Sequence, residues 1–129
     1  MFVKKGLALS VLLFQLPSAL AAAPPFTAAQ SKAGHTVYTA NCQGCHGNKL
    51  QGGAGPALVG KMFLAKWSGK KLDDLHYIIH SLMPLNKPNS LTDAQYLNVT
   101  TFILQSNGIK AGKKPLAKAD LKKHLIALK

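Results

Sequence analysis

Acidic residues and cysteine are scarce in this chain of 129 residues, and arginine is absent. The chain has four aspartates and no glutamate against 16 lysines. Without arginine, and without aromatic residues alternating with the C-terminal lysines, the sequence does not favour nucleic-acid binding. It also has no run of alternating apolar and polar residues of the kind that forms strands, so it predicts an all-α fold.

The only two cysteines lie in the run Cys-Gln-Gly-Cys-His at residues 42–46. Two thiols three positions apart can each add to a vinyl group of a haem, and the adjacent imidazole can then reach the iron. A redox dithiol, half of a zinc site and a single disulfide are the alternatives. A redox dithiol would need a βαβ context, and a zinc site would need further ligands at matched spacing. The run therefore predicts covalent haem attachment through Cys42 and Cys45, with His46 as an iron ligand.

The first residues predict export. Lys4 and Lys5 precede an apolar run at residues 7–16, and residues 19–21 are small, as a signal peptidase requires. A retained membrane anchor is the alternative, but the run is shorter than the ~20 apolar residues that a spanning helix needs. We therefore expect residues 1–21 to be a cleaved secretory signal and the protein to be periplasmic.

Residues 22–33 are expected to form a linker and the start of a first helix near Ala29. Gly34 would lie inside this helix, where glycine costs about 1 kcal/mol relative to alanine. Either another helix crosses closely at this point or Gly34 marks the start of the helix. The glycine-rich segment 47–60 is expected to be a loop, because its glycines fit neither a phosphate loop nor a dinucleotide fingerprint.

Two further helices are expected, which gives three or four in total. One starts at Ser68 and ends before Pro84, because proline ends a helix and holds the preceding Met83 out of helical geometry. The other opens with a capping box formed by Thr92 and the glutamine three positions later. It stops at Gly108 and its preceding asparagine.

In this order the motifs resemble class I cytochromes c of the small bacterial, monohaem type. The resemblance covers residues 34–108, which we expect to be the cytochrome domain. The matching features are Gly34 and Tyr38, the run at 42–46, Gly55 to Leu58, Phe63 and Trp67, Met83-Pro84, and the final helix.

The resemblance implies one covalently bound haem c, with His46 as the proximal and Met83 as the distal iron ligand. It implies that the carbonyl of Pro56 accepts the proton on the other imidazole nitrogen. It also implies that the first and last helices cross at Gly34 and Tyr38.

The chemistry of a thioether favours Met83 independently of the resemblance. A soft, neutral sulfur prefers ferrous iron and raises the reduction potential, as an electron carrier requires. Met62 is a competing methionine, and His80, one helical turn before Met83, would instead give a bis-histidine site. Trp67 and Tyr96 are expected either to be core aromatics or to hydrogen-bond toward a haem propionate.

Most of the positive charge lies at the C-terminal end. Residues 109–129 contain seven lysines and one aspartate, a net charge of +6, whereas residues 22–108 carry +4. Leucines at near-helical spacing between these lysines predict either a short amphipathic helix or a solvated terminus. We expect this lysine-rich tail to be separable from the domain, to steer docking with acidic redox partners and to allow association with a membrane surface.

Two classes of function remain. The first is an electron carrier without catalytic residues, working as a free shuttle or as a subunit of a periplasmic dehydrogenase or terminal oxidase. The second is a haem enzyme or a protein that binds peroxide or a small gas at an open sixth position. An enzyme would need an acid–base pair over the distal face, and His76 and His80 are the candidates near Met83. The sequence favours the electron carrier.

Overall fold

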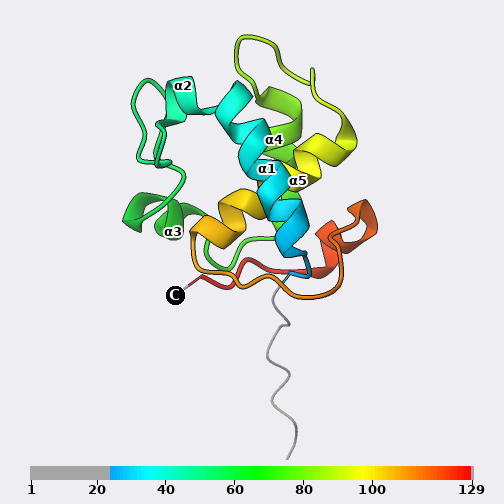
Figure 1. The fold of residues 1–129 in the computed structure, drawn as a ribbon. Coiled ribbons are helices and arrows are strands. Elements are labelled where there is room, and N and C mark those ends of the chain that lie inside the picture. Colours follow the sequence, from blue (N-terminus) through cyan, green and yellow to red (C-terminus); the bar gives the residue numbers. More distant parts are fainter. Residues whose placement is uncertain (1–23, 129) are drawn as a thin grey trace, which may run out of the picture.

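The computed structural model describes residues 24–128, which form five α-helices and one 3-10 helix (Figure 1). These are α1 (Ala28–Asn41), α2 (Gln43–His46), α3 (Lys61–Trp67), α4 (Leu72–Leu82), α5 (Asp93–Ser106) and η1 (Lys118–Lys123). Between residues 24 and 128 the only β pairing is two isolated bridges. The all-α prediction is confirmed. No helix in this part of the chain is long and apolar enough to cross a membrane, and the predicted signal at 1–21 lies outside the described residues.

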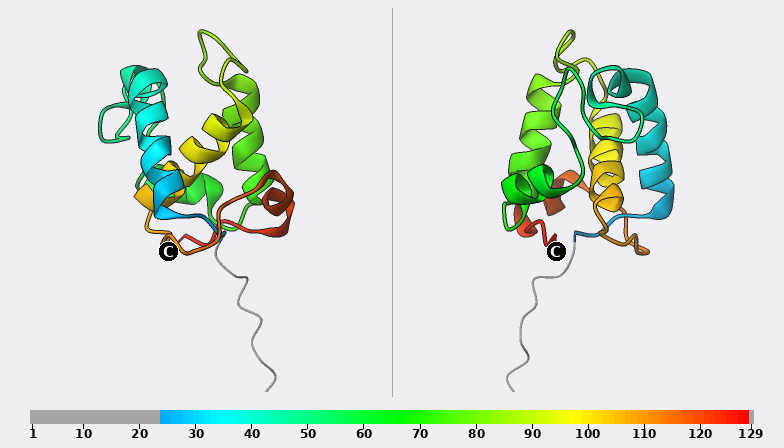
Figure 2. Two further views of the ribbon diagram at one scale, coloured as in Figure 1. Left: turned by 45° about the vertical axis from the view of Figure 1, so that its right-hand side comes forward. Right: turned by 90° about the vertical axis from the view of Figure 1, so that its left-hand side faces the viewer.

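Helix α5 lies between α1 and α4 (Figure 2). Both α1 and α5 begin with a capping box, in which a threonine hydroxyl accepts from the backbone of a glutamine whose side chain bonds back to the threonine amide. The box predicted at Thr92 is therefore confirmed. The equivalent box at Thr27, with Gln30, starts α1 and was not predicted.

The crossing of α1 and α5 depends on Gly34. A Cβ atom at this position would lie 1.9 Å from the carbonyl oxygen of Asn98 and 2.9 Å from the Cβ of Phe102. The Tyr38 ring, one turn further along α1, packs on the Phe102 ring at 5.3 Å between centroids. Gly34 is therefore present because the two helices approach closely there, and not because a helix begins.

The segment between the glycine-rich loop and α4 differs from the prediction. Ser68 follows the last residue of α3 and its hydroxyl donates to the carbonyl of Leu128 at 2.8 Å, so it does not start a helix. The positive φ of Gly69, 76°, breaks the helical path before α4 begins at Leu72. At its other end α4 stops as predicted, and Met83 is extended with φ −113° and ψ 151°.

Residues 109–128, which we call the C-terminal strap, pack against the body of the protein at the lower end of Figure 1. Leu116, Leu121 and Ile126 are 3%, 2% and 0% exposed. Backbone hydrogen bonds also join the strap to the body at Phe26, Gly69, Lys70 and Leu72. The structure therefore contradicts the expected separable tail, because its apolar side chains complete the core.

The expected amphipathic α-helix of the strap is instead the short 3-10 helix η1. The carboxylate of Asp120, only 4% exposed, accepts from the amide of Ala117 at 3.1 Å and faces Lys114 and Lys123 at 3.4 and 3.7 Å. This backbone hydrogen bond and the nearby lysine charges lower the pKa of Asp120. The buried aspartate therefore stays ionised and fixes the start of η1.

Candidate haem site

His46 is the last residue of the one-turn helix α2 and is 8% exposed. Its Nδ1 lies 2.7 Å from the carbonyl oxygen of Pro56. A carbonyl can only accept, so Nδ1 carries the proton and Nε2 keeps its lone pair. An imidazole oriented in this way is suited to bind a metal through Nε2.

The glycine-rich loop holds this imidazole in place from the backbone. The amide of Gly55 donates to the carbonyl of Cys45 at 2.9 Å, and the amide of Gly52 donates to the carbonyl of His46 at 2.7 Å. A Cβ atom on Gly55 would lie 2.9 Å from the His46 ring, so only glycine allows this close approach. Gly55 is therefore required for the loop to pack against the imidazole of His46.

Tyr38 connects α1 to the start of the same loop. Its hydroxyl donates to the carbonyl of Gly47 at 2.5 Å. Burial, with a smaller contribution from Cys42, raises the pKa of Tyr38 to about 12. The hydroxyl therefore keeps its proton and the hydrogen bond at neutral pH.

Cys42 and Cys45 are both free thiols, the first half-buried and the second exposed. Burial, and secondly the neighbouring Cys45, raises the pKa of Cys42 to about 11. A reactive redox dithiol needs a lowered thiol pKa, so this arrangement disfavours that alternative. A zinc site is also disfavoured, because residues 24–128 contain no group of three or more histidine, cysteine or acidic side chains that could hold a metal. Two free thiols beside an oriented imidazole fit a covalent haem.

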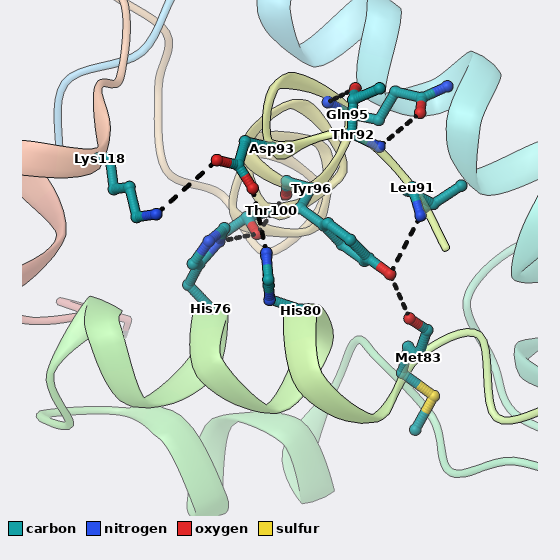
Figure 3. A network of polar contacts seen from close by, with 10 residues as sticks. All are labelled: His76, His80, Met83, Leu91, Thr92, Asp93, Gln95, Tyr96, Thr100 and Lys118. Carbon is teal, nitrogen blue, oxygen red and sulfur yellow. Dashed lines mark hydrogen bonds and ion pairs between the residues drawn. The ribbon is translucent and has the colours of Figure 1, made fainter. Parts of the chain in front are cut away.

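Met83 follows α4 directly and is half-buried. Its amide donates to the carbonyl of Ile79 at 3.2 Å, and its carbonyl accepts from the hydroxyl of Tyr96 at 2.7 Å. Its side chain points away from the network that His76 and His80 form (Figure 3). The link from Tyr96 to Met83 was not predicted, because it joins α5 to the residue that follows α4 and no local pattern signals it.

The competing ligands and Trp67 have other surroundings. His80 points from α4 toward α5, where its Nε2 lies 3.1 Å from Oδ1 of Asp93 (Figure 3). Met62, on α3, is 80% exposed. Trp67 is half-buried, with its ring centroid 6.4 Å from that of Phe63. Of the three distal candidates, Met83 has the side chain that is both half-buried and outside a polar network.

His76 is buried and neutral. Its Nδ1 lies 3.2 Å from the hydroxyl of Thr100, which itself donates to the carbonyl of Tyr96 at 2.8 Å. Because that hydroxyl uses its proton on Tyr96, it accepts from Nδ1 of His76. Burial, and secondly the charge of His80, lowers the pKa of His76 to about 4. At pH 7 His76 therefore carries no charge.

The helical fold, the free thiol pair beside an oriented histidine and the methionine after α4 define a c-type cytochrome. Residues 29–103 match the family described as cytochrome C oxidase, cbb3-type, subunit III. The match spans more than half of the chain, so the chain belongs to this family. The protein is a class I monohaem cytochrome c with one covalently bound haem c, and its role is electron transfer.

One solved structure shows the same fold. The chain is similar to the crystal structure of the sulfane dehydrogenase SoxCD from Paracoccus pantotrophus, with 20% sequence identity and a TM-score of 0.58. The similarity covers 95% of this chain and 68% of the other. No curated protein matches the chain at a significant level.

Proposed function

We propose that the chain is a periplasmic one-electron carrier whose haem is bonded to Cys42 and Cys45 and ligated by His46 and Met83. The bound haem supplies a one-electron couple between ferric and ferrous iron. The observation that supports the proposal most strongly is the 2.7 Å contact between Nδ1 of His46 and the carbonyl of Pro56. It leaves Nε2 free for iron, and the neutral thioether of Met83 stabilises the ferrous state.

The surroundings of Met83 support a non-catalytic role. An enzyme that activates peroxide would need an acid–base pair close to the distal position. The neighbouring His76 and His80 both face α5, where they bond to Thr100 and Asp93. Neither histidine is directed to the side on which the Met83 side chain lies (Figure 3). His76 and His80 are therefore not placed to act as an acid–base pair at the distal position.

Redox proteins with acidic docking surfaces are the partners that we propose. The exposed lysines of the strap, among them Lys110, Lys113 and Lys122, make one end of the molecule strongly positive. Such a field steers association with a negative partner, and it also allows contact with an anionic membrane surface. The partner would be a periplasmic dehydrogenase or a terminal oxidase, served by a free shuttle or by a bound subunit. The family description and the SoxCD likeness support the bound form.

Carbon monoxide binding separates the carrier from the gas-binding alternative. If His46 and Met83 close both axial positions, the reduced protein keeps its spectrum under carbon monoxide, and the oxidised protein shows a weak sulfur-to-iron band at the red edge. The Met83→Ala variant then binds carbon monoxide and loses the band. Met62→Ala is the matched control and behaves as the wild type. Stoichiometric binding by the wild type would favour the open-site alternative, and a band that persists in Met83→Ala would refute the ligand assignment.

A further inference from the structure

We infer that Tyr96 is a positioning residue for the distal ligand: its hydroxyl ties the backbone of Met83 to α5 and thereby sets how readily Met83 leaves the iron. The inference rests on the proposed assignment of Met83 as that ligand. In this role Tyr96 does not touch the iron and acts only through Met83.

The hydroxyl of Tyr96 holds both ends of the segment between α4 and α5. It donates to the carbonyl of Met83 at 2.7 Å and accepts from the amide of Leu91 at 3.4 Å (Figure 3). Tyr96 is 0% exposed, so its hydroxyl is shielded from water and depends on these two partners. One oxygen atom therefore fixes the beginning and the end of the segment that carries Met83.

Few other contacts hold this segment. Residues 85–90 are all exposed, and their one backbone hydrogen bond in the structure is local, from the amide of Lys87 to the carbonyl of Pro84 at 2.8 Å. A segment with exposed side chains and few tertiary hydrogen bonds opens more readily than the core. The bonds to Tyr96 are therefore a large part of what resists movement of Met83.

Tyr96 is itself held in position by its neighbours. The ring of His80 packs against it with 4.6 Å between centroids, and Nε2 of His80 lies 3.1 Å from Asp93. The other carboxylate oxygen of Asp93 is 3.7 Å from Nζ of Lys118, in the strap. The Thr100 hydroxyl donates to the backbone carbonyl of Tyr96 at 2.8 Å. The Tyr96 ring therefore cannot turn away from Met83 without losing its contact with the His80 ring, which is itself held by Asp93.

Displacement of Met83 by imidazole measures how strongly the Tyr96 hydroxyl holds the Met83 backbone in place. Imidazole binds ferric iron only when Met83 is away, so its apparent affinity depends on how often the segment opens. Tyr96→Phe removes both hydrogen bonds of the hydroxyl, so it should change this opening equilibrium by at least the roughly 2- to 10-fold expected for one buried hydrogen bond. In the haem-loaded Tyr96→Phe variant we expect the apparent Kd for imidazole, read from loss of the sulfur-to-iron band, to fall by this factor. Tyr77→Phe, at an exposed tyrosine of α4, should leave it unchanged.

A second control separates positioning from general stability. Val99 lies on the same helix as Tyr96 and is 1% exposed, so Val99→Ala destabilises the core without removing a hydrogen bond to Met83. We expect Val99→Ala to lower the urea midpoint while keeping the wild-type Kd for imidazole. The inference is overturned if Tyr96→Phe retains the wild-type Kd, or if Val99→Ala lowers that Kd as much as Tyr96→Phe does. Either of these two outcomes would overturn the role of Tyr96 and leave the proposed function intact. A wild type without the sulfur-to-iron band would instead refute the proposed function itself.

Discussion

Removal of the C-terminal strap by ending the chain after Gly108 should abolish the folded protein. The strap buries the side chains of Leu116, Leu121 and Ile126, each at most 3% exposed. Full burial of such a side chain stabilises a protein by about 1.5–3 kcal/mol, so the three together contribute roughly 5–9 kcal/mol. A small domain has a total stability of about 5–15 kcal/mol. The truncated chain should therefore lose most or all of its net stability, quite apart from the backbone hydrogen bonds that it also loses.

Urea unfolding, followed by the haem absorbance and by circular dichroism, tests this reasoning. The full-length protein should unfold in one transition, and the truncated chain should show no native baseline. Two point variants compare the loss of stability at a buried and at an exposed leucine of the strap. Leu121→Ala should cost about 2–5 kcal/mol, whereas Leu125→Ala, at a side chain that is 43% exposed, should change stability by much less. A truncated protein with the wild-type spectrum and urea midpoint would refute the role of the strap in the core.

Three further predictions concern single residues. Met83→Ala should lower the reduction potential, because a ligand that prefers ferrous iron is lost, and a redox titration with an unchanged or higher potential would contradict this. Gly34→Ala should destabilise the protein although alanine favours helices by about 1 kcal/mol, since its Cβ would lie 1.9 Å from the Asn98 carbonyl oxygen; a higher melting temperature would exclude the close crossing. The pKa of His76 is lowered by burial from 6.5 to about 4, so the unfolded chain binds a proton there first, and stability should fall as the pH drops from 6.5 toward 4. His76→Gln should remove part of that decline in urea unfolding, and a decline equal to that of the wild type would contradict the assignment.

Local sequence signals predicted the parts of the fold that depend on neighbouring residues. The capping box at Thr92 and the end of α4 before Pro84 are properties of a few consecutive residues, and both were predicted. The start of α4 was placed too early at Ser68, because that hydroxyl bonds to the distant Leu128 and not to its own helix. The packing of Leu121 was missed for a similar reason. Its spacing is compatible with either a solvated helix or a buried strap, and only the surfaces of the body decide between them.

In the candidate site, too, local motifs were predicted from the sequence and contacts between distant residues were not. The run at 42–46 predicted a covalent haem, since its spacing is itself the chemical requirement, and the family assignment confirms it. The roles of individual ligands stay predictions. The structure adds what a sequence cannot show, namely that His80 faces Asp93 and that Tyr96 is bonded to the carbonyl of Met83. Both contacts join residues 13 positions apart, from the last turn of α4 or the residue after it to α5.

Acid–acetone extraction of the purified protein tests covalent haem attachment, because it removes a haem that is held only by iron ligands and leaves one that is bonded to the chain. We expect the haem absorbance to stay with the precipitated wild-type protein. Cys42→Ala and Cys45→Ala should hold the cofactor weakly or lose it. Recovery of free haem in the acetone phase from the wild type would contradict attachment through Cys42 and Cys45.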